Sequence, residues 1–184
     1  MEIALINEEM FKAYSPIKDD TIITKFVPYI AIAQKMYIEK ILGRPLVEEL
    51  QLQIKSATVT PVPDPYPITP ENQALIIELA PALSFYAVYQ GLPFHWAAIV
   101  NKGITVRESE NSGAVTVNDI AQLRRWLKDD AESLARDLQS YLCGCQASYP
   151  TWSPASGYGC ASGNCGSSTN AVPMDFGIHI PKRR

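Results

Sequence analysis

Residues 69–91, TPENQALIIELAPALSFYAVYQG, form the most apolar part of the chain and constrain its architecture most strongly. Thr69 suits a helix N-cap and Pro70 suits the first helical position, so the sequence predicts a helix that begins here. We expect this helix to kink at Pro81 and to end at Gly91. Its side chains leave hardly any polar face, and such a helix has to be covered on all sides. It is therefore either the central helix or partly covered by a neighbouring subunit.

Apolar residues at helical spacing predict three more helices. One covers 24–42 and ends at Gly43, which can adopt the left-handed conformation at a helix C-terminus. A second covers 45–54 and must pack against the first, because the connection between them is so short. The longest begins at residue 116 or 118 and ends near Leu142, with one apolar stripe and an opposite charged face. The predicted fold class is therefore all-α, a bundle of about four helices.

Two segments between these helices do not show helical spacing. The alternating prolines of 56–70 predict a stiff extended loop, with a ligand for a proline-binding signalling module as the alternative. Residues 99–117 contain two short alternating stretches, Ile104–Arg107 and Ala114–Val117, which predict a small β-hairpin. An isolated two-stranded hairpin is marginal in water, so we expect it to pack on the helices or to pair with another chain.

The C-terminal part of the chain, 143–184, differs in composition from the rest. Asp175 is the only formally charged residue between Cys143 and Pro181, and six of the ten glycines lie in this stretch. Such a segment cannot form a hydrophobic core of its own. We therefore divide the chain into a helical domain, 1–142, and an extended C-terminal arm that becomes ordered on a partner.

Composition and charge favour a structural subunit over several other classes of protein. Only 19% of the residues are charged, against about 25% in typical domains, so we expect part of the exterior to lie inside an assembly. The net charge is -3, whereas a dedicated nucleic-acid binder would carry a basic excess. The N-terminus lacks a basic start followed by an apolar run, and no stretch matches a membrane span, so we expect synthesis in the cytoplasm.

Signals for catalysis are few. The chain has two histidines, His95 and His179, and contains no nucleophile elbow, zinc-protease motif, phosphate loop or dinucleotide fingerprint. We expect His95 to lie in an aromatic loop as a packed or capping histidine, with a general base as the alternative. His179 alternates with two isoleucines, which places it on the outward face of an extended segment. The chain is predicted not to be an enzyme, since a small hydrolase or transferase would need a site built around His95.

The four cysteines, Cys143, Cys145, Cys160 and Cys165, allow three interpretations. Four thiolates in two pairs suit tetrahedral zinc, although the single residue between Cys143 and Cys145 is tight for chelation. The other two interpretations are a disulfide formed late, in an extracellular particle, and ordinary thiols. We predict no metal and no cofactor. A helical interaction module with a zinc-binding tail is the alternative function.

Spaced residues of the helical region resemble a family of small phage proteins. The matching positions are Pro28, Tyr29, Ile30, Ala33, Gln34, Ile38, Ile41, Leu42, Gly43, Leu46 and Leu50, then Asn101, Lys102 and Gly103, and finally Tyr141, Leu142 and Cys143. The family comprises the head–tail connector (adaptor or ring) proteins of tailed phages, including crAss-like phages, and the resemblance covers roughly 21–143. The proline-rich loop and the C-terminal arm have no counterpart in it.

The resemblance implies a structural virion protein without catalytic residues. Such subunits form a homo-oligomeric ring, commonly dodecameric, which docks on the portal protein at the head–tail junction and attaches other tail or ring proteins. DNA passes through the channel without specific recognition, and no membrane is involved. From the residues themselves, we expect the hairpin and the arm to contact other subunits or the portal. The expected interface residues are Ile104, Val106, Arg107, Val115, Tyr149, Trp152, Tyr158, Phe176, Ile178, Ile180, Lys182, Arg183 and Arg184.

Overall fold

The computed structural model describes residues 3–17, 23–59, 68–100, 103–106 and 117–160, and this part of the chain is mostly helical, as predicted. The helices are α1 (Glu8–Tyr14), α2 (Val27–Ala33), α3 (Glu39–Leu42), α4 (Arg44–Val59), α5 (Pro70–Trp96) and α6 (Val117–Gly144). A π-helical stretch, Gln34–Ile38, joins α2 to α3 in one continuous helix. The other described elements are the strands β1 (Ala97–Val100) and β2 (Gly103–Val106) and the 3-10 turns Ile23–Lys25 and Gln146–Ser148.

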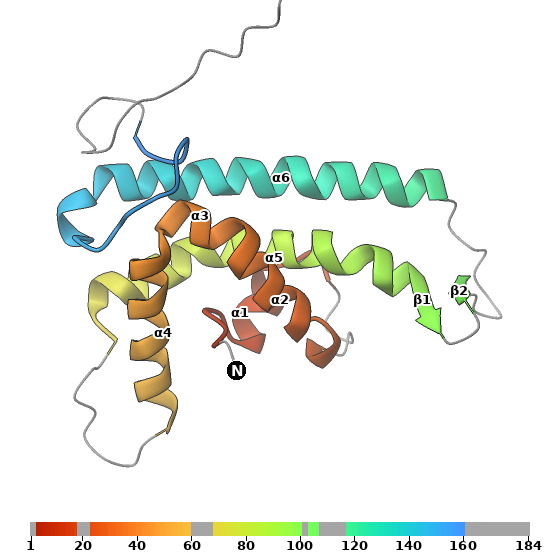
Figure 1. Cartoon of the computed structure of the whole chain (residues 1–184), viewed down its shortest axis with the longest axis horizontal. Coiled ribbons are helices and arrows are strands. Elements are labelled where there is room, and N and C mark those ends of the chain that lie inside the picture. Colours follow the sequence, from red (N-terminus) through yellow and green to blue (C-terminus); the bar gives the residue numbers. More distant parts are fainter. Residues whose placement is uncertain (1–2, 18–22, 60–67, 101–102, 107–116, 161–184) are drawn as a thin grey trace, which may run out of the picture.

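Helix α5 is the centre of the bundle (Figure 1). It packs against α6 on one side and against α2 and α1 on the other, and Leu75, Leu79 and Leu83 are fully buried. Among the described residues, α5 contains the one stretch long and apolar enough to cross a membrane, Pro70–Phe94. Most of its most apolar window, 61%, is buried inside the protein. The apolar composition of α5 is thus accounted for by its central position.

Local sequence signals correctly placed several helix ends. The Thr69 hydroxyl accepts a hydrogen bond from the Asn72 backbone N–H at 3.3 Å, which is the expected N-cap of α5. Pro28 lies in the first turn of α2, where its missing N–H leaves no helical hydrogen bond unmade. Gly43 has a φ of +78° and ends α3. Its left-handed conformation lets α4 begin at the next residue.

Two helices continue beyond their predicted ends. Helix α5 runs through Gly91 and Pro93 to Trp96. A Cβ atom on Gly91 would lie only 3.0 Å from the rings of Phe26 and Tyr29, so this glycine permits close packing of α5 on the α2 region and does not end the helix. Helix α4 runs to Val59, so the first part of the predicted proline-rich loop is helical; residues 60–67 lie outside the described part of the chain.

The strand pairing differs from the predicted hairpin. Strand β2 pairs antiparallel with the preceding strand β1, with Ala97 opposite Val106 and Val100 opposite Gly103. The prediction paired this strand with 114–117 instead. Val117 begins α6, and residues 107–116 lie outside the described part of the chain. The hairpin over 104–117 is therefore not shown.

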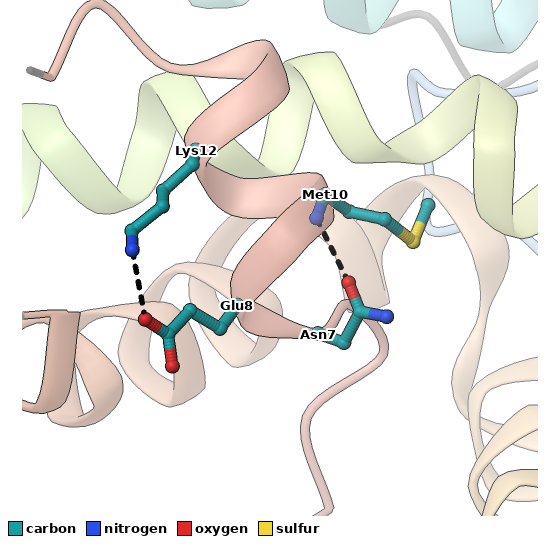
Figure 2. A network of polar contacts seen from close by, with 4 residues as sticks. All are labelled: Asn7, Glu8, Met10 and Lys12. Atoms are coloured by element: carbon teal, nitrogen blue, oxygen red, sulfur yellow. Dashed lines mark hydrogen bonds and ion pairs between the residues drawn. The ribbon is translucent and has the colours of Figure 1, made fainter. Parts of the chain in front are cut away.

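The N-terminal segment, which no sequence pattern assigned, forms a short helix on the bundle. The Asn7 side chain caps α1 by accepting from the Met10 backbone N–H at 2.8 Å, and Lys12 pairs with Glu8 at 3.0 Å (Figure 2). The buried Gln34 amide holds the preceding residues: its oxygen accepts from the Leu5 backbone N–H at 3.0 Å, and its nitrogen donates to the Ile3 carbonyl at 3.1 Å. One polar side chain in the π-helical stretch thus fixes the start of the described chain.

Residues 145–160 fold back onto the bundle, which corrects the prediction of an extended arm for this part of the chain. The Trp152 indole N–H donates to the Ile41 carbonyl at 2.8 Å, and the Tyr149 hydroxyl donates to the Glu71 carbonyl at 2.8 Å. The Thr151 hydroxyl donates to Glu49 of α4 at 2.7 Å. These bonds satisfy buried polar atoms, so a segment with almost no charge can be covered by its own chain. Residues 161–184 lie outside the described part.

Candidate assembly surface

The amino-terminal half of α6 exposes two large apolar side chains. Leu123 is 41% exposed and Trp126 is 57% exposed. The side of α6 that packs on the bundle is formed by buried residues such as Leu127, Ala131 and Leu138. Trp126 immediately precedes Leu127, so its side chain leaves the helix about 100° away from that packed side. It lies on the surface, next to the contact with α5 and not within it.

Three aspartates share the side of α6 that carries Leu123 and Trp126. The five residues Asp119, Leu123, Trp126, Asp130 and Asp137 follow one another at intervals of three, four or seven residues, which places them along one side of a helix. All five are exposed. We call this set the α6 stripe.

The stripe has an apolar part followed by an acidic part. Within the described residues, neither Asp130 nor Asp137 makes a hydrogen bond or an ion pair. Two cations of the same helix are engaged elsewhere: Lys128 pairs with Glu132 at 3.3 Å, and the Arg124 guanidinium lies 4.4 Å above the centre of the Tyr89 ring. The two aspartates are therefore free to meet cations from another molecule or another segment.

A second exposed apolar pair lies on the helix formed by α2, the π-helical stretch and α3. Ile32 is 42% exposed and Met36 is 45% exposed. They are four residues apart, so they are neighbours on the helix surface. Both this helix and α6 pack against α5. The bundle thus exposes apolar side chains on two different helices.

Two stacked tyrosines join the π-helical stretch to α5. The ring centres of Tyr37 and Tyr86 are 4.0 Å apart and their planes differ by 2°. The Gln90 side-chain amide donates to the Tyr37 hydroxyl at 2.6 Å. Burial raises the pKa of Tyr86 to about 12 and also raises the pKa of Tyr37. Both phenols stay protonated at neutral pH, so this pair joins the helices and offers no nucleophile.

A shallow, open depression of about 370 Å³ lies where the α3–α4 corner meets the C-terminal segment. Its lining residues are Lys35, Glu39, Lys40, Gly43, Arg44, Ser153 and Ala155. They include neither a histidine nor a cysteine, and Arg44 is paired with Glu48 at 2.7 Å.

The structure corrects two of the predicted interface residues. Tyr149 is 3% exposed and Trp152 is 9% exposed, and both belong to the core of their own chain. Tyr158 is partly buried and packs against the same core. Ile104 and Val106 lie in β2. The remaining predicted interface residues lie outside the described part of the chain: Arg107, Val115, Phe176, Ile178, Ile180, Lys182, Arg183 and Arg184.

Of the three interpretations of the cysteines, the structure favours the disulfide. Cys143 and Cys160 are joined by a disulfide, with their Cα atoms 5.7 Å apart. Their sulfurs are then not thiolates, which is the form that binds zinc. Cys145 is a free, partly exposed thiol, and Cys165 lies outside the described residues. Within the residues that the structure describes, no three side chains of the metal-binding types lie together.

His95 lies within α5, so the prediction that it occupies a loop is wrong, and its side chain is not described. His179 lies outside the described residues.

Sequence reasoning missed Trp126. Its signal was a large aromatic residue beside the charged Arg125, one position before Leu127 of the apolar stripe. Such a residue cannot lie at the centre of the packed side, and it marks a surface that another molecule can cover.

Comparison with protein families gives one match. A family model described as "Family of unknown function (DUF6712)" matches residues 38–162, more than half of the chain. The matched region includes α4, α5, α6 and the C-terminal segment with its disulfide. No curated protein and no solved structure matches the chain. The chain therefore belongs to the DUF6712 family, a family of unknown function.

Proposed function

We propose that the chain is a ring-forming head–tail connector, or adaptor, subunit of a tailed-phage virion. In this role it docks on the portal protein at the head–tail junction, extends the DNA channel and attaches other tail or ring proteins. It is made in the host cytoplasm and needs neither a cofactor nor a membrane. The spaced residues between 21 and 143 that resemble connector proteins support this proposal.

The observation that carries the proposal is that two different helices of one bundle each expose a pair of large apolar side chains. Exposed Leu123 and Trp126 lie on α6, and exposed Ile32 lies on α2 with Met36 next to it. Two different surfaces on one subunit suit a head-to-tail interface, which closes into a ring when its rotation allows. Tryptophan is enriched among residues that contribute most to binding between proteins. Trp126 is therefore the leading candidate for an anchor residue.

The charge of the chain is compatible with a DNA channel. Non-specific binding to DNA depends on lysine and arginine side chains that neutralise phosphates. With a net charge of -3, the subunit has no overall basic excess that would hold DNA as it passes. The proposal also keeps Ile104 and Val106 of β2 and the residues after Cys160 as contacts with neighbouring subunits or with the portal.

Electron microscopy of the purified full chain, alone and with its portal protein, tests the proposal. We expect closed rings of uniform diameter that stack coaxially on the portal. The substitution Met36→Glu should reduce the number of rings, because it places a charge in one of the two apolar surfaces. The matched control is Leu52→Glu on α4, at a side chain that is 50% exposed outside both surfaces. Single subunits in both samples would contradict the proposal.

A further inference from the structure

We propose that the α6 stripe is the docking site for residues 176–184 of a neighbouring copy of the chain. This inference rests on the ring proposed above and names two surfaces that meet in it. Three observations support it. Apolar and charged side chains follow one another in the same order along the stripe and along the C-terminal residues, and the distances between them are similar on the two segments.

The stripe presents its groups in a fixed order along α6. Exposed Leu123 and Trp126 come first, and the carboxylates of Asp130 and Asp137, which have no partner among the described residues, follow toward the carboxy-terminal end. A large aromatic side chain that is 57% exposed next to free carboxylates suits a ligand with an apolar part and a cationic part.

The C-terminal residues carry the complementary groups in the same order. Phe176, Ile178 and Ile180 alternate along the chain and are followed by the basic run 182–184. These three cations are the only lysine or arginine residues after Arg136. An extended segment places alternate side chains on one face, so its apolar residues can contact one surface together.

The lengths of the two orders are compatible. Eleven helical residues separate Trp126 from Asp137, a rise of about 17 Å. Lys182 lies on the same face of an extended segment as Ile178, four residues or about 13 Å further on. When Ile178 covers Trp126, the flexible four-carbon stem of Lys182 therefore lets its ammonium group reach the Asp137 carboxylate, with which it can form a charge-assisted contact.

The direction of this match points to a neighbouring copy. The disulfide holds Cys160 beside Cys143, at the carboxy-terminal end of α6. Trp126 lies seventeen helical residues earlier, about 26 Å away along the helix. In the proposed register the docked residues run in the same direction as α6. The chain's own tail would have to travel to the amino-terminal half of α6 and reverse there, whereas the tail of a neighbouring copy can enter from that end.

Charge reversal in the full-length chain tests the contact, with self-association measured by sedimentation velocity. The single variants Asp137→Lys and Lys182→Glu should each weaken self-association by at least about tenfold. The double variant should recover most of the loss, because the two charges again attract each other. The matched control is Glu9→Lys, at an exposed glutamate of α1 that is not part of the stripe. A peptide of residues 174–184 should compete with wild-type assembly, and a scrambled peptide should not.

The outcomes separate this inference from the proposed function. Wild-type assembly in all three charge variants, with no effect of the peptide, would overturn the docking site and leave the ring proposal in place. A wild-type chain that stays monomeric would overturn the contact between copies together with the ring. If the single variants lose assembly and the double variant does not regain it, the pairing of Asp137 with Lys182 is refuted.

Discussion

One end of α6 is covered by the C-terminal segment and the other is exposed to solvent. Each of these two regions contains one tryptophan. Trp152, in the segment that folds over the carboxy-terminal end, is 9% exposed, and its indole N–H donates to the Ile41 carbonyl. Trp126, near the amino-terminal end, is 57% exposed. A buried tryptophan with a satisfied N–H stabilises the fold, whereas an exposed one on a helix offers a contact surface. The same residue type thus has two separate tasks in one chain.

The largest expected effect is on stability at the covered end. We expect Trp152→Ala to lower the free energy of unfolding by about 3–5 kcal/mol, because it removes a large buried side chain and leaves a cavity. Urea denaturation followed by circular dichroism measures the change. A loss of less than about 1 kcal/mol would mean that residues 145–160 are not part of the folded core.

The disulfide should contribute a somewhat smaller amount. It closes a loop between residues 17 apart, which corresponds to about 3 kcal/mol of restricted unfolded-state entropy. We expect reduction or Cys160→Ser to lower the melting temperature in thermal unfolding, and Cys145→Ser to leave it unchanged, since Cys145 is a free thiol. Equal melting temperatures with and without reductant would contradict this assignment.

The tyrosine stack gives the folded core a dependence on alkaline pH. The pKa of Tyr86 is about 12 in the folded chain and about 10 when unfolded, so the folded state holds the proton more tightly. This contribution is fully present below pH 10 and is lost as the pH rises toward 12, by roughly 2 kcal/mol. Denaturant titrations from pH 9 to pH 12 should show the loss, and Tyr86→Phe should reduce it. An unchanged slope in that variant would place the titration elsewhere.

The smallest effect on stability is expected at the uncovered end. Trp126→Ala should change the free energy of unfolding by less than about 0.5 kcal/mol, as exposed substitutions usually do. The same variant should weaken self-association by at least about tenfold, because it removes the proposed anchor. Urea denaturation and sedimentation velocity on one preparation measure both quantities. A large loss of stability, with assembly intact, would reverse the roles assigned to the two tryptophans.

Local chemistry made part of this fold predictable. The Thr69 cap, the left-handed Gly43 and the apolar spacing of α6 act within a few residues, so the sequence alone placed these elements correctly. Gly91 was misinterpreted because its role depends on Phe26 and Tyr29, which lie far away in the sequence. Tertiary packing there outweighs the local tendency of glycine to end a helix.

The candidate surface was harder to predict than the bundle. Tyr149 and Trp152 were assigned to an interface because their segment has almost no charge, yet their partners, Glu71 and Ile41, lie 78 and 111 residues away. No local pattern encodes such contacts. Trp126 differs from these two: its place one residue before Leu127 already sets it off the packed side, but the extent of its exposure depends on how α6 packs against α5.

The mass of the assembly formed by the purified full-length chain is the most direct test. Each subunit has a mass of 20.3 kDa, so native mass spectrometry can count the subunits in each particle. We expect one dominant species that contains many copies, as a closed ring requires. The mass of a single chain at every protein concentration would contradict the account.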